Sequence, residues 1–150
     1  MNKGNLLLVD DEPLILKNLK FSLTSYADSV FLAADGQEAL NILENAEIHC
    51  ILCDVNMPRM NGLELIKKVR ELGNDVPFIF FTGHGNKEMM IEVARYGAFD
   101  FIDKPYFDGV EEVVCRGLRV GLKLNAGLPP LEFVSEYQKL LTELNGNGEE

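Results

Sequence analysis

Short apolar runs, each followed by a segment with helical periodicity, recur along the chain. The runs cover residues 6–9, 30–34, 50–54, 77–81 and 99–103, and the helical segments cover 13–25, 37–45, 62–72, 87–95 and 108–123. Runs that are apolar throughout are typical of strands buried on both faces, and strict alternation with helices favours parallel strands joined by right-handed crossovers. We therefore predict an α/β fold, a doubly wound sheet of five parallel strands flanked by five helices.

The helical segments separate apolar from polar side chains, as segment 62–72 illustrates. Leu63, Ile66 and Val69 recur at three-residue steps, and we expect them to face inward. Charged side chains of the same segment, Arg70 among them, are expected to face mostly outward. Each helix then buries one face on the sheet and exposes the other to water.

The chain has 150 residues and a formal net charge of −10, from 24 acidic and 14 basic side chains. This charge disfavours binding to nucleic acid phosphates and anionic lipids, so we expect protein or cation partners. No apolar run approaches the roughly 20 residues that cross a bilayer, and the N-terminal apolar run is too short for a signal peptide. We therefore expect a cytoplasmic chain without a membrane segment.

The three cysteines include Cys50 and Cys53, which lie in the third apolar run with the spacing Cys-x-x-Cys. A redox pair needs exposed thiols at a helix start, whereas residues three apart in a strand face opposite sides of the sheet. An odd number of cysteines also gives no disulfide framework. We interpret both cysteines as buried packing residues.

Polar side chains that can do chemistry lie at the ends of four of the apolar runs. Asp10 and Asp11 follow the first run, Asp54 ends the third, Thr82 follows the fourth and Lys104 follows the fifth. Ligands of open α/β sheets bind beyond the carboxyl ends of the strands, so we expect these side chains to share one cleft. The first turn lacks the Gly-x-Gly-x-x-Gly of dinucleotide-binding folds, and no Walker-type sequence occurs.

Carboxylates that converge in such a cleft need a positive partner. Two unit charges a few ångströms apart repel by about 4 kcal/mol at an effective dielectric of about 20. Mg²⁺ suits this set better than zinc does, because no histidine or cysteine cluster joins the carboxylates. With Lys104 as a second cation, Thr82 as a donor and one carboxylate left to attack, the set describes a phosphoryl-transfer site that forms an aspartyl phosphate.

In this order the residues resemble those of the response-regulator receiver domains of bacterial two-component signalling. The resemblance covers about residues 5–122 and rests on Asp10-Asp11, Asp54 within Asp-Val-Asn-Met-Pro-x-Met-Asn-Gly, Thr82, Phe101 and Lys104-Pro105. It implies a flavodoxin-like receiver fold. It also implies that Asp54 accepts a phosphoryl group from the phosphohistidine of a sensor histidine kinase or phosphotransfer protein.

The same resemblance assigns roles to the other site residues. Mg²⁺ would be held by Asp10, Asp11 and Asp54 and by the backbone carbonyl of Asn56. The phosphoryl oxygens would be bound by Thr82 and Lys104, and the Lys104-Pro105 bond would be cis.

A conformational switch is also implied by the resemblance. Thr82 would move toward the phosphoryl group, and Phe101 would rotate into the space that Thr82 leaves. Because Phe101 has no hydroxyl, a hydrogen bond from this residue to a partner is excluded. His84 follows Thr82 by two positions, and we expect it to affect the lifetime of the phosphoryl group.

Residues 125–150 are expected to follow a receiver domain of residues 1–124 as a linker, a short amphipathic helix and a flexible tail. The helix is predicted over residues 131–144, from apolar side chains at three- and four-residue steps. Because the helix at 108–123 is apolar over more than half its circumference, we expect the tail helix to dock on it, within one chain or across a homodimer. The tail is too short and too acidic for a DNA-binding output domain.

We expect a single-domain response regulator that switches protein–protein interactions and is no enzyme beyond its own phosphorylation and dephosphorylation. One alternative is a phosphohydrolase or phosphotransferase with an aspartyl-phosphate intermediate. Such enzymes of the haloacid-dehalogenase type, however, carry Asp where this chain has Asn56. The other alternative is a receiver-fold adapter that works without phosphorylation. The downstream target is not specified by the sequence.

Overall fold

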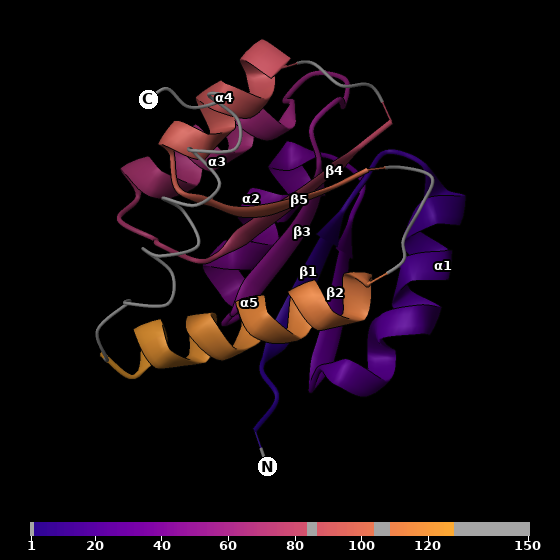
Figure 1. Ribbon diagram of the computed structural model, residues 1–150, viewed down its shortest axis with the longest axis vertical. Helices are drawn as coiled ribbons and strands as arrows, with labels where there is room; N and C mark the ends of the chain where they lie inside the picture. Colours follow the sequence, from indigo (N-terminus) through magenta and orange to yellow (C-terminus); the bar gives the residue numbers. More distant parts are fainter. Residues whose placement is uncertain (1, 84–86, 104–108, 128–150) are drawn as a thin grey trace, which may run out of the picture.

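The computed structural model describes residues 2–83, 87–103 and 109–127, and its core is one open α/β sheet (Figure 1). Five parallel strands lie in the order β2-β1-β3-β4-β5. The strands are β1 (Asn5–Val9), β2 (Ser29–Ala33), β3 (Cys50–Asp54), β4 (Phe78–Thr82) and β5 (Ala98–Asp103). The helices are α1 (Pro13–Leu23), α2 (Gly36–Asn45), α3 (Gly62–Glu71), α4 (Lys87–Arg95) and α5 (Val110–Asn125). The predicted fold class is therefore confirmed.

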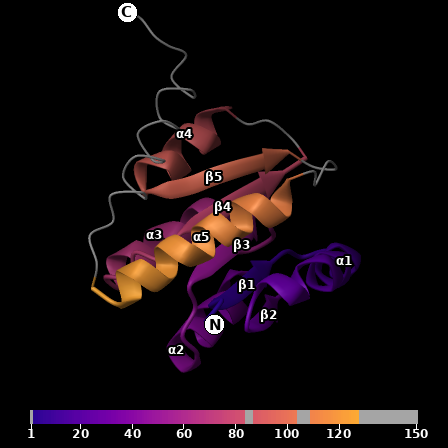
Figure 2. The same cartoon turned by 60° about the horizontal axis from the view of Figure 1, so that its bottom comes forward.

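Helices cover both faces of the sheet, as Figures 1 and 2 show: α1 and α5 lie on one face, and α2, α3 and α4 on the other. Alternate strand residues supply the two cores. In β1, Leu6 and Leu8 pack toward α1 and α5, whereas Leu7 and Val9 pack toward the other three helices. The central strands β1, β3 and β4 are therefore buried on both faces, which is why their sequences read as continuous apolar runs, whereas the edge strands β2 and β5 are partly exposed.

The two cysteines of β3 lie on opposite faces of the sheet, as predicted. Cys50 belongs to the core under α1 and α5, and Cys53 belongs to the core under α2, α3 and α4. Both are completely buried, and burial raises the pKa of each thiol. The carboxylates of Asp54 and Asp10 raise the pKa of Cys53 further. Both thiols stay protonated at neutral pH, so the pair is a packing feature.

Helix α5 packs very closely on β3, and on His49 just before it, through two glycines. A β-carbon on Gly117 would come within 2.7 Å of the Cys50 sulfur, and one on Gly121 would overlap the backbone oxygen of His49. The second contact is with backbone, which cannot rotate away. The two glycines therefore set the distance between α5 and the sheet.

Arg70 differs from its predicted outward position. From α3 its guanidinium donates four hydrogen bonds to backbone oxygens of two loops. The acceptors are Tyr96 (Nε, 2.6 Å), Asn74 and Val76 (both Nη1, 2.9 Å) and Gly97 (Nη2, 3.2 Å). The guanidinium also lies over the Phe78 ring, 5.4 Å from its centroid. A planar group with five N–H donors can satisfy several carbonyls at once, which helical periodicity cannot reveal.

Other boundaries differ from the predictions by small amounts. Helix α1 ends at Leu23 and continues as a 3₁₀ turn over Thr24–Tyr26, whereas a helix through residue 25 was expected.

Among the described residues, no helix combines the length and apolar composition that crossing a membrane requires. The helix predicted over residues 131–144, with its docking on α5, lies outside the described part of the chain.

Candidate functional site

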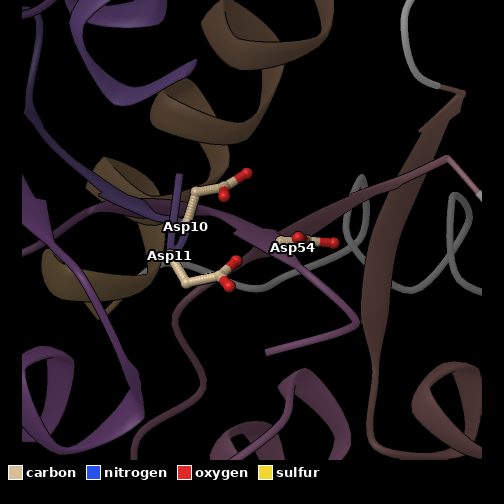
Figure 3. A group of neighbouring side chains, drawn as sticks. All are labelled: Asp10, Asp11 and Asp54. Atoms are coloured by element: carbon tan, nitrogen blue, oxygen red, sulfur yellow. The ribbon is translucent and has the colours of Figure 1, made fainter. Parts of the chain in front are cut away.

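Three carboxylates meet at the carboxyl ends of β1 and β3 (Figure 3). One oxygen from each of Asp10, Asp11 and Asp54 lies within 4.8 Å of the others. They converge because β1 and β3 are neighbours in the sheet, with Val9 paired to Cys53 in the register. The predicted convergence of these three residues is therefore what the structure shows.

The three carboxylates have different surroundings. Asp10 is completely buried, and its Oδ1 accepts a hydrogen bond from the Glu12 N–H at 2.8 Å. Asp54 is 5% exposed, and its Oδ1 accepts from the Asn56 N–H at 3.2 Å. Asp11 is exposed. Asp10 and Asp54 are thus buried and held by backbone hydrogen bonds, whereas Asp11 lies on the solvent-exposed side of the group.

The donor chemistry of this group fits a hard divalent cation. Unit negative charges at such separations repel by about 3 to 4 kcal/mol per pair at an effective dielectric of about 20. A bound cation would offset this repulsion between the carboxylates. Oxygen donors with room for water are the ligands that Mg²⁺ selects. The described residues of the group include no histidine, and the buried Cys53 thiol is protonated, so the group does not suit zinc.

The loop after Asp54 is fixed where it enters α3. The Gly62 N–H donates to the Val55 oxygen at 2.8 Å. Asn61 and Glu64 form a capping box, in which each side chain accepts from the other's backbone N–H, at 2.9 and 3.0 Å. The position of Asp54 is therefore tied to the first turn of α3.

The same loop is tied to the first turn of α2. Arg59 has a left-handed backbone, with φ of 67°, and its Nη2 lies 3.0 Å from Oδ2 of Asp35. Asp35 caps α2 by accepting from the Glu38 N–H at 2.9 Å. Met60 packs on Gly36, where a β-carbon would come within 2.6 Å of the methionine sulfur. Arginine has no preference for this backbone region, so the sequence carried no sign of this arrangement.

Thr82 ends β4, next to β3 in the sheet, and is 4% exposed. Its Oγ1 accepts a hydrogen bond from the side-chain amide of Asn56 at 3.3 Å. Asn56 thus touches Asp54 through its backbone and Thr82 through its side chain. The sequence had indicated only the carbonyl of Asn56, because nothing in its spacing relates it to a residue on another strand.

Phe101 lies on β5, partly buried, and pairs with Phe80 in the register of β4 and β5. The rings of Phe80 and Phe101 stack with centroids 6.0 Å apart, and Phe78 stacks on Phe80 at 5.4 Å. An aromatic column therefore runs along this face of β4 from Phe101 to the Arg70 guanidinium. Lys104 and His84, with the Lys104-Pro105 bond, lie outside the described residues.

The fold and this site together define a class of protein. An open sheet in the order β2-β1-β3-β4-β5, with carboxylates at the ends of β1 and β3 and a buried hydroxyl at the end of β4, is the arrangement of a flavodoxin-like receiver domain. The family model for the response regulator receiver domain matches residues 6–114. The chain belongs to this family.

Curated relatives agree with this assignment. The chain is 34% identical over 106 residues to the transcriptional regulatory protein FixJ of Bradyrhizobium diazoefficiens, which is 71% of this chain and 52% of that protein. It is 33% identical over 117 residues to the response regulator protein TodT of Pseudomonas putida, which is 78% of this chain and 50% of TodT. The chain thus spans about half the length of these relatives.

Solved structures show the same fold. The crystal structure of FixJ-N superimposes with a TM-score of 0.72 at 32% identity, covering 79% of this chain and 96% of that one. The chemotaxis protein CheY4 of Vibrio cholerae superimposes with a TM-score of 0.67 at 31% identity, covering 77% and 96%. A CheY-like receiver domain protein of Methanospirillum hungatei gives 0.74 at 30% identity, covering 80% and 97%.

Proposed function

We propose that this chain is a phosphorylation-dependent switch in two-component signalling, with Asp54 as the phosphoryl acceptor. The phosphoryl group would come from the phosphohistidine of a sensor histidine kinase or of a phosphotransfer protein. One observation carries the proposal: Asp54 is a nearly buried carboxylate within 4.8 Å of two further carboxylates, in a chain of the receiver family.

In the proposed reaction an oxygen of Asp54 attacks phosphorus, the bond from phosphorus to the imidazole nitrogen breaks, and the imidazole leaves with the electron pair. The product is a mixed anhydride on Asp54. Asp10, Asp11, Asp54 and the Asn56 carbonyl would hold Mg²⁺, which neutralises charge on the phosphoryl oxygens when bound. Thr82 and Lys104 would bind those oxygens.

The proposed output is a change in binding to other proteins. Receiver domains act as signalling switches, and the chemistry proposed here is limited to phosphorylation and dephosphorylation of Asp54 itself. Phe101 is the proposed switch aromatic, because it lies on the strand next to Thr82 and stacks on Phe80. His84 remains a proposed modulator of phosphoryl lifetime, to be tested by comparing dephosphorylation rates of the wild type and His84→Ala.

The proposal is tested by phosphorylating the full chain with acetyl phosphate and Mg²⁺ and locating the label by mass spectrometry. We expect one phosphoryl group on Asp54 in the wild type and none in Asp54→Asn. Asp75→Asn is a charge-matched control, because Asp75 is an exposed carboxylate before β4, at the other end of the sheet. Undiminished labelling of Asp54→Asn at another residue would refute the assignment.

A further inference from the structure

The loop between β3 and α3 carries Asn56, whose backbone carbonyl is a proposed ligand of Mg²⁺. The base of this loop is closed by the hydrogen bond from the Gly62 N–H to the Val55 oxygen at 2.8 Å. Farther along the loop, Nη2 of Arg59 lies 3.0 Å from Oδ2 of Asp35, which precedes α2. Asn56 therefore lies between two points at which the loop is attached to the rest of the molecule.

The backbone of Arg59 is in a conformation that arginine disfavours. Its φ is 67°, and among the residues that the structure describes it is the only non-glycine residue with a positive φ. In this left-handed region the β-carbon of an L-residue comes too close to the following carbonyl oxygen, a cost that glycine avoids. The conformation of residue 59 therefore needs support from contacts outside its own backbone.

Asp35 is placed to give that support. Its side chain is only 16% exposed, and it accepts a hydrogen bond from the Glu38 N–H at 2.9 Å, which fixes it at the start of α2. The next loop residue, Met60, packs on Gly36 of the same helix. The Arg59 side chain is 78% exposed, and exposed ion pairs stabilise only modestly. The pair is therefore comparable with the cost of the left-handed backbone, so the loop conformation should depend on it.

We propose that Arg59 and Asp35 are positioning residues for the metal site. Their ion pair holds residue 59 in the left-handed region and so keeps the loop in the conformation in which Asn56 contributes to Mg²⁺ binding. This inference rests on the proposed function and extends it, because it gives two residues outside the acidic group a role in Mg²⁺ affinity. Without the pair, the fraction of molecules with a competent loop falls, and the apparent affinity falls in proportion.

The test measures the Mg²⁺ dissociation constant of the full chain from the NMR shifts of the Asp54 and Asn56 amides during a titration. Arg59→Gly and Arg59→Ala remove the same charge and the same ion pair, but only glycine adopts the left-handed region freely. We expect Arg59→Ala to bind Mg²⁺ about three- to tenfold more weakly than Arg59→Gly. Because both variants lose the same charge, the direct electrostatic effect on Mg²⁺ cancels in this comparison.

Asp35→Asn tests the other member of the pair. Its amide oxygen can still cap α2, but the ion pair with Arg59 is lost. We expect Asp35→Asn to weaken Mg²⁺ binding about two- to fivefold more in the wild-type background than in the Arg59→Gly background. The lost negative charge reduces the attraction for Mg²⁺ in both backgrounds, so only the support of residue 59 contributes to the difference.

Arg95→Ala is the control for the loss of an arginine, and it should bind Mg²⁺ like the wild type. Arg95 is exposed and ion-paired to Glu92, and it ends α4 just before β5, at the other edge of the sheet. Equal Mg²⁺ affinities of Arg59→Ala and Arg59→Gly would overturn the inference, as would an equal effect of Asp35→Asn in the two backgrounds. If the wild type is nevertheless labelled at Asp54, only this inference is refuted. A wild type that neither binds Mg²⁺ near these amides nor is labelled at Asp54 refutes the proposed function as well.

Discussion

Gly62 lies against the backbone of Asp54 so closely that no other residue type fits there without movement. A β-carbon at position 62 would come within 2.9 Å of the Asp54 oxygen and 3.0 Å of the Val55 Cα. The Phe80 ring would be 2.9 Å away on another side. The first turn of α3 therefore rests directly on the end of β3 that carries the proposed phosphoryl acceptor.

Gly62→Ala should consequently destabilise the chain and disturb Asp54. Two of the three close contacts are with backbone, so we expect the free energy of unfolding to fall by about 1–3 kcal/mol, as for an overpacked core. Urea denaturation measures this loss, and the rate of acetyl phosphate labelling measures the disturbance at Asp54. An alanine variant with wild-type stability and labelling rate would show that α3 moves away from β3 at no cost.

Removing one carboxylate of the acidic group should weaken its hold on a divalent cation. Mg²⁺ that binds only the folded chain raises the melting temperature as its concentration increases. Asp11→Asn removes an exposed ligand without creating a buried defect, so we expect a smaller rise at each Mg²⁺ concentration. Differential scanning fluorimetry across a Mg²⁺ series measures this, with Asp75→Asn as control. Identical curves for the wild type and Asp11→Asn would exclude Asp11 as a ligand.

The cap of α2 should make a pH-dependent contribution to stability. The hydrogen bond from the Glu38 N–H, and then the Arg59 guanidinium, lower the pKa of Asp35 from its ordinary value of 3.8. The ionised Asp35 therefore contributes to folding stability above its unfolded-state pKa. That contribution is lost as the pH falls through the lower pKa that Asp35 has in the folded state. We expect Asp35→Ala to cost about 1 kcal/mol at neutral pH and less below about pH 4.

Urea unfolding at several pH values measures that difference between the wild type and Asp35→Ala. Asp35→Asn is the matched control, because its amide oxygen still accepts from the Glu38 N–H but does not titrate. The Asp35→Asn variant should lose less stability at neutral pH than Asp35→Ala. A difference between wild type and Asp35→Ala that stays constant down to about pH 2 would contradict the prediction.

Arg70 should be hard to replace, because four backbone oxygens depend on it. Burial lowers the pKa of its guanidinium to about 10, so the group is still charged at neutral pH. Arg70→Met removes every donor and should lower the free energy of unfolding by about 2–4 kcal/mol. Arg70→Lys keeps the charge but not the planar set of N–H donors. Urea denaturation should therefore show a similar loss in the free energy of unfolding for Arg70→Lys. A lysine variant as stable as the wild type would mean that charge alone matters.

Much of the fold was predictable because the apolar runs, the helical periodicity and their strict alternation all indicate a parallel α/β sheet. The central strands are buried on both faces, and all five strands read as mainly apolar runs that alternate with helical segments, so their number, order along the chain and parallel direction followed directly. Asp10, Asp11 and Asp54 could be placed at one edge of the sheet because each lies at the carboxyl end of a strand, and parallel strands end at the same edge. The spatial order of the strands could not be predicted from the pattern, because the same alternation of elements suits several doubly wound orders.

The contacts that were missed join side chains to partners outside their own element, several of them far away in the sequence. The periodicity of α3 places Arg70 toward solvent, yet its long side chain reaches back over Phe78 to two loops. The hydrogen bond from Asn56 to Thr82 depends on the register between β3 and β4, which local pattern does not contain. Such contacts are decided by tertiary packing, and a structure is needed to find them.

The position of β3 beside β1 also has a consequence for synthesis of the chain. Residues 1–45 contain β1, α1, β2 and α2, and they are synthesised before Asp54 is added. During that time Asp10 and Asp11 have no third carboxylate to repel them. The acidic group is completed only when β3 pairs with β1. A free fragment that stops before residue 50 lacks Asp54, so it should show no Mg²⁺-dependent stabilisation through this group.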